Sequence, residues 1–139
     1  SDLKFMGFDI HHCGKGTGLF YEQIDLWEKF CQSQFVLIHN SHPTCFEWGF
    51  IDPRFMLAAA ARTPVICENK EPMTWSCEPG KDYFPVDFGS SYTNEIEQIT
   101  RLPIDHRERV CENVFRKICK DHHPLNRLAQ IIFDHELRT

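Results

Sequence analysis

The sequence has no Cys-x-x-Cys pair, no recognisable signal peptide and no apolar run near the roughly 18 residues that a membrane helix needs. It also lacks an excess of basic residues, because its formal net charge is −5 at pH 7. That charge argues against a general nucleic-acid binder, which needs a basic face. Internal repeats and low-complexity segments are absent as well. We therefore predict a chain with no membrane span and no nucleic-acid partner.

The cysteines indicate a reducing environment. All 7 are irregularly spaced, and several stand in apolar stretches, where a free cysteine behaves as a small hydrophobic residue. The odd count and the spacing predict unpaired thiols and a cytoplasmic location. With 139 residues, 42% of them hydrophobic and 25% charged, the chain fits a single globular domain over residues 1–139. Because it begins with Ser rather than Met, we expect a piece of a longer protein or a processed product.

Predicted strands alternate with predicted helices along the chain. Apolar stretches predict strands at Leu3–Ile10, Phe35–Ile38, Thr63–Cys67 and Tyr83–Phe88. The second of these is a continuous apolar run, so we expect it to be covered on both faces, and Pro85 suggests an edge position for the last. Helical spacing predicts helices over residues 19–32, from Asp52 onward, and from about residue 92 to the end. The alternation predicts an α/β fold with a doubly wound, Rossmann-like, mostly parallel sheet.

The helix that begins at Asp52-Pro53 marks the strongest candidate site. Asp52 suits the N-cap and Pro53 the first helical position, and the apolar, alanine-rich helix that follows must be covered on most sides. In open α/β sheets ligands bind outside the carboxyl ends of the strands, where free helix amides attract anions. Arg54 would add a bidentate contact to a diphosphate. We therefore predict a phosphate site formed by Asn40, Ser41, Asp52, Pro53 and Arg54.

Two further loops contain residues that bind ligands in other proteins. In "GKGTG" (Gly14–Gly18), Lys15 would serve as a cation for a phosphate, but the spacing is not that of a P-loop and a flexible strand-to-helix turn explains the glycines better. His39, His42 and Cys45 stand at three-residue steps, but zinc needs four convergent ligands. We predict no metal site and no cofactor.

Taken in order, these motifs resemble the end of a GT-B glycosyltransferase, an enzyme of two Rossmann-like domains. More narrowly, they resemble the spore-maturation-protein-like branch of family 1. In that family an Arg-x-Phe-Glu pattern, a small-residue helix, Gly-x-Pro and a strand carry the nucleotide-sugar site. Here Arg54 matches the arginine, Ala58–Ala61 the helix and Thr63–Ile66 its exit into a strand. The resemblance covers residues 35–137.

The resemblance implies a C-terminal, donor-binding half-domain that binds a nucleoside-diphosphate sugar and lacks its acceptor-binding partner domain. It implies that this chain alone would not be active, because a GT-B enzyme reacts in the cleft between its halves. Two departures stand out: the ribose-binding glutamate of the family falls on Leu57, and its helix-closing glycine falls on Arg62. An inactive Rossmann-like interaction module is therefore the alternative. A receiver-like regulatory domain fits less well, since Asp9 with Asp52 is a poor acidic cluster.

Overall fold

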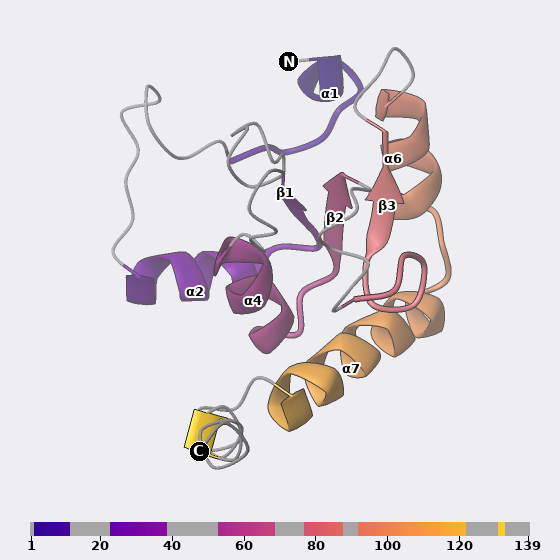
Figure 1. The fold of residues 1–139 in the computed structure, drawn as a ribbon. Coiled ribbons are helices and arrows are strands. Elements are labelled where there is room, and N and C mark those ends of the chain that lie inside the picture. The colour runs from indigo at the N-terminus through magenta and orange to yellow at the C-terminus, as the bar shows by residue number, and fades with distance from the viewer. Residues whose placement is uncertain are drawn as a thin grey trace.

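A computed structural model describes residues 2–11, 23–38, 53–68, 77–87, 92–121 and 131–132 (Figure 1). Over these residues the elements are α1 (Asp2–Phe5), α2 (Gln23–Gln32), β1 (Val36–Ile38), α4 (Pro53–Ala60), β2 (Val65–Glu68), β3 (Phe84–Val86), α6 (Tyr92–Thr100) and α7 (Ile104–Asp121). The predicted α/β, Rossmann-like class is confirmed. A doubly wound sheet of GT-B type stays a prediction, because the described sheet is small.

The sheet has three parallel strands in the order β1-β2-β3, so β2 lies in the centre. Val36 pairs with Val65 at one side of β2, and Ile66 pairs with Phe84 at the other. The short apolar stretch "VIC" in β2 is almost completely buried, with relative exposures of 2% or less. A strand with no polar face needs cover on both sides, which explains why helices lie on both faces of this sheet.

Side chains alternate between the two faces as the strand period of two requires. One face, with α2, α4 and α7, contains Phe30, Val36, Ile38, Phe55, Ala58, Ala59, Val65, Cys67, Cys77, Tyr83 and Val114. The other face, with the N-terminal segment, α6 and the start of α7, contains Leu3, Ile66, Phe84, Val86, Ile96 and Val110. The long helix α7 contributes to both clusters and runs across the bottom of the view in Figure 1.

Helix α4 is placed by its small residues. It begins at Pro53, as the sequence predicts, and Ala58 and Ala59 have no exposed surface. Because alanine has no side chain beyond Cβ, the helix axis can approach the sheet closely on this side. Phe55, also fully buried, packs edge-on against Tyr83 with ring centroids 5.9 Å apart. The prediction that this helix is covered on most sides is confirmed.

A tight turn connects α4 to β2. The N–H of Thr63 donates to the carbonyl of Ala58 at 3.0 Å, and the N–H of Arg62 donates to Ala59 at 3.1 Å. This pair of bonds defines a Schellman motif, which requires a left-handed residue just after the helix. Arg62 takes that position with φ 56°, although glycine is the residue that adopts it without steric cost. Glycine at this position would therefore meet the conformational demand without that cost.

Polar contacts fix the same corner to its neighbours. The buried hydroxyl of Thr63 donates to the carbonyl of Phe30 near the end of α2, at 2.7 Å. The guanidinium of Arg62 lies 4.1 Å above the ring centroid of Phe115 in α7. It also comes within 3.9 Å of the Glu112 carboxylate. The turn thus contacts α2 and α7, and the cation–π contact offsets part of the cost of the left-handed backbone.

Two expectations about strands are wrong. Of the predicted strand Leu3–Ile10, the first three residues instead end the helical turn α1, and residues 8–10 have no regular secondary structure. Gly7 closes the turn at φ 84°, while Leu3 anchors it in the core. The glycine allows the chain to reverse where a strand would continue. In β1, Leu37 is 43% exposed, so this strand is not covered on both faces. The cover on that face packs over β2 and β3, and β1 is an outer strand of the described sheet.

The remaining predicted elements agree with the structure where it describes them. Helices α6 and α7 lie where the helical spacing places them, and Pro85 is in β3, an outer strand of the described sheet. The predicted helix that closes the chain falls outside the described residues except at positions 131 and 132. Among the described helices, none is both long and apolar enough to cross a membrane.

The left-handed conformation of Arg62 gives the first testable prediction. We expect Arg62→Gly to be more stable than Arg62→Ala by about 1 kcal/mol, because both lose the contact with Phe115 but only glycine relieves the backbone. The measurement is the urea midpoint at constant m-value. As a matched control, Ala60→Gly at the last residue of α4, where φ is not positive, should instead lose up to about 1 kcal/mol. Equal midpoints for the two Arg62 variants would contradict the assignment of strain at this turn.

Candidate functional site

The amino end of α4 is the part of the predicted phosphate site that the structure describes. In the unit β1-α4-β2 the strands are parallel, so the helix starts at the carboxyl edge of the sheet and returns to the amino edge. Pro53 and Arg54 occupy its first turn and are both exposed. No acidic residue stands in that turn. The helix amides and Arg54 therefore present positive potential at the edge where ligands bind in open α/β sheets.

The other predicted ligand-binding residues fall outside the described residues. These are Lys15, Asn40, Ser41 and Asp52. Their predicted roles as a phosphate cation, as loop ligands and as the cap of α4 thus stay predictions. The structure brings Pro53 and Arg54 together at one helix end, and that is the described part of the site.

The same edge of the sheet contains carboxylates that the sequence did not single out. Glu68 is the last residue of the central strand β2. Asp87 follows β3 directly, and its backbone N–H donates to the carboxylate of Glu95 in α6 at 3.2 Å. The sequence contained a signal for Glu68 and for Asp87, since a polar residue at the end of a buried strand lies at the carboxyl edge of the sheet. Glu95 comes from a helix later in the chain, and only the fold reveals its place.

A second polar group lies near the start of β3 and has a structural role. Asp82 is 3% exposed, and its Oδ2 accepts hydrogen bonds from Lys117 Nζ and from the N–H of Glu78, the latter at 2.7 Å. Asn113 Nδ2 donates to the carbonyl of Lys81 at 3.3 Å. These contacts attach residues 78–82 to α7 across more than 30 positions of sequence. A buried carboxylate needs such partners, so the pair fixes the segment rather than exposing a reactive group.

The neighbouring thiol and phenol are unreactive at neutral pH. Burial, with a smaller contribution from Asp82, raises the pKa of the Cys77 thiol from 9.0 to about 11. Burial likewise raises the pKa of Tyr83 from 10.0 to about 12, with Cys67, Cys77 and Asp82 adding to the shift. A thiol nucleophile needs a lowered pKa, because the thiolate is the reactive form. Nucleophilic catalysis by Cys77 is therefore disfavoured.

Metal binding finds no support in the part of the chain that the structure describes. No group of three or more His, Cys, Asp or Glu side chains there is arranged to hold a metal ion. The cysteines within this part, Cys31, Cys67, Cys77, Cys111 and Cys119, are all free thiols. The predicted His39, His42 and Cys45 group lies outside it.

Comparison of the chain with protein families, with curated proteins and with solved structures gave no match. Its chemistry is therefore argued from its own residues. The described geometry offers one anion-attracting helix end at the carboxyl edge and carboxylates at the ends of the neighbouring strands. It also offers an ion pair between Lys117 and the buried Asp82, just before β3.

The buried ion pair predicts a large loss of stability when its cation is removed. We expect Lys117→Met to lower the free energy of unfolding by about 2–3 kcal/mol, because Asp82 would remain buried without a cation. The loss falls below that of a fully buried pair, since the Lys117 side chain is 33% exposed. Urea unfolding measures it, with Lys120→Met, in the next turn and exposed, as the control. If both variants lose the same small amount, the pair is not a structural contact.

Stability should also fall at alkaline pH. The pKa values of Cys77, Cys111 and Tyr83 are raised to about 11, 11 and 12, so the unfolded chain loses these protons first and binds fewer of them above pH 9. Burial lowers the pKa of Lys117, but the hydrogen bond and charge of Asp82 outweigh this and raise it overall, which acts in the same direction at higher pH. Each group contributes up to about 1.4 kcal/mol of lost stability per pH unit in its window. Urea unfolding between pH 8 and 10.5 measures the slope.

The variant Cys77→Ala should reduce this slope by up to one proton, whatever it does to stability at pH 7. Cys119→Ala is the matched control for the removal of a thiol, because Cys119 is exposed. An unchanged slope in Cys77→Ala would mean that this thiol ionises equally in both states.

Proposed function

We propose that this chain is the donor-binding half-domain of a GT-B glycosyltransferase and binds a nucleoside-diphosphate sugar at the carboxyl edge of its sheet. In this proposal the sheet is the described part of a doubly wound, Rossmann-like domain. The acceptor-binding domain would belong to another part of the protein or to another chain. The isolated chain would bind the donor without turning it over.

One observation carries the proposal: α4 begins at the carboxyl edge with exposed Arg54 in its first turn. The free amides of a helix start bind phosphate oxygens, and a guanidinium adds two parallel hydrogen bonds to them. The buried alanines of α4 support the proposal, because they hold this helix end close to the sheet. Pro53 has no N–H of its own and leaves the adjoining amides unchanged.

The chemistry proposed for this site is electrostatic. Transfer of a sugar from its diphosphate leaves negative charge on the departing nucleotide. Arg54 and the positive end of the α4 dipole would stabilise that charge without a proton transfer. Glu68 and Asp87 lie at the carboxyl ends of β2 and β3, whereas the helix α4 follows β1. In this proposal their carboxylates would therefore face the sugar or ribose rather than the phosphates. The raised pKa of Cys77 agrees with a role outside the chemistry.

An inactive interaction module is the second candidate, and Leu57 favours it. Leu57 stands where the family has its ribose-binding glutamate, and here it lies within α4 and packs against the core cluster. A leucine cannot accept a hydrogen bond from a ribose hydroxyl. If the site has lost its ligand, Arg54 would serve a surface role only.

A thermal-shift series separates the two candidates. UDP, GDP, ADP, dTDP and their sugar conjugates are added to the 139-residue chain without metal. A ligand at about 100 times its Kd stabilises the native state by about 2.7 kcal/mol, so a base-selective rise of several degrees is expected. The rise should disappear in Arg54→Ala and persist in Arg109→Ala, an exposed arginine on α7. No rise with any nucleotide, or a rise that Arg54→Ala leaves intact, would reject the proposed site.

A further inference from the structure

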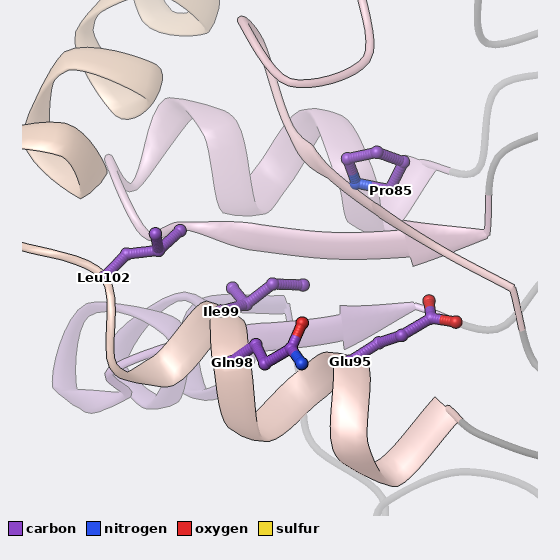
Figure 2. Close-up of a pocket in the computed structure, with 5 residues that line it drawn as sticks. All are labelled: Pro85, Glu95, Gln98, Ile99 and Leu102. Atoms are coloured by element: carbon purple, nitrogen blue, oxygen red, sulfur yellow. The ribbon is translucent and has the colours of Figure 1, made fainter.

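A surface pocket of about 280 Å³ lies between the outer strand β3 and α6 (Figure 2). It is lined by Pro85, Glu95, Gln98, Ile99 and Leu102. The three α6 residues among these stand at positions i, i+3 and i+4, so they share one face of the helix. Figure 2 shows them rising toward the strand, with Leu102 at one end of the pocket and Glu95 at the other. The volume is just below the roughly 300 Å³ at which drug-sized ligands begin, so it suits a small group.

The lining combines an apolar floor with an acidic end. Pro85, Ile99 and Leu102 supply the apolar surface, while Glu95 and Gln98 supply the polar atoms. Among the residues that line the pocket, none carries a positive charge. The nearby Arg101 is already engaged, because its Nη2 lies 2.5 Å from Glu97 Oε1. An anionic ligand would therefore meet the negative charge of Glu95 with no cation among the lining residues.

The Glu95 carboxylate is held in place at its end of the pocket. Its Oε2 accepts the hydrogen bond from the Asp87 N–H, which ties the helix to the residue after β3. Asp87 itself is exposed and does not line the pocket, so Glu95 supplies the carboxylate at this end. This arrangement is complementary to a cation, and a fixed carboxylate loses less entropy on binding than a mobile one.

The outer edge of β3 is unsuited to pairing with another strand. Pro85 is the middle residue of a three-residue strand and has no N–H to donate to a ladder. A short edge interrupted by proline resists strand addition. The occupant of the pocket is therefore a side group that enters beside Pro85, rather than a backbone that extends the sheet.

We propose that this pocket binds an alkylguanidinium group, with the guanidinium at Glu95 and Gln98 and the alkyl chain on Pro85, Ile99 and Leu102. The planar guanidinium presents its donors as a rigid fork, which suits a carboxylate beside an amide carbonyl. It is also more weakly hydrated than an ammonium and tolerates apolar contact. The proposal does not require nucleotide binding, because none of the residues that line the pocket belongs to the predicted phosphate site.

The experiment is a ¹H–¹⁵N NMR titration of the 139-residue chain with butylguanidinium, and in parallel with butylurea. Butylurea has the same shape without the charge. We expect saturable shifts at the amides of α6 and of Val86 and Asp87 with butylguanidinium alone. Glu95→Gln, which can still accept the Asp87 N–H, should raise Kd about fivefold. The spectrum of the variant reports whether it is folded.

Glu28→Gln on α2 is the matched control, because this glutamate is exposed and does not line the pocket. It should leave Kd unchanged. Equal binding of butylurea, an unchanged Kd in Glu95→Gln, or no saturable shift at these amides would overturn the proposal. A pentapeptide with a central arginine distinguishes the sources of the group: tighter binding than butylguanidinium indicates a protein partner, and equal binding a small molecule.

Discussion

The central strand β2 sets the constraint on which the rest of the structure depends. Its residues Val65, Ile66 and Cys67 are buried on both faces, and both of its edges are paired. Such a strand has no surface that tolerates water, so each neighbouring element must cover a part of it. The alanines of α4 cover one face at close range, while α6 and the N-terminal segment cover the other. The position of the α4 amino end, and with it the proposed anion site, follows from this cover.

Much of this arrangement could be predicted from local patterns. The continuous apolar stretches predict β1 and β2, the Asp-Pro pair predicts the start of α4, and four-residue apolar spacing predicts α7. The failures have physical reasons. Residues 3–10 contain enough apolar and aromatic residues for a strand, but Gly7 takes a left-handed conformation that reverses the chain. The exposure of Leu37 depends on how far the elements packed on that face of the sheet extend over β1, and no local sequence pattern encodes this.

The candidate site shows the same division. Arg54 could be placed at a helix start from the sequence, because proline and a preceding aspartate mark that start. Glu68 was within reach of the sequence, because it directly follows the predicted strand Thr63–Cys67, and in the structure it is the last residue of β2. Glu95 contacts Asp87, and Lys117 contacts Asp82. Each contact joins a helix to a residue at one end of β3. Such pairs have no periodicity, so they emerge only when the elements are in place.

The link between Asp82 and Lys117 also has a consequence for how the molecule opens. It joins residues 35 positions apart, and the Asp82 carboxylate is buried within the segment that leads into β3. If α7 lifted away alone, a charge would remain in an apolar environment, which is costly. Local fraying of α7 beyond Lys117 therefore costs little free energy. Detachment of the middle of α7, by contrast, must also detach residues 78–82. In native-state hydrogen exchange these two distant segments would form one cooperative unit, with a shared opening free energy.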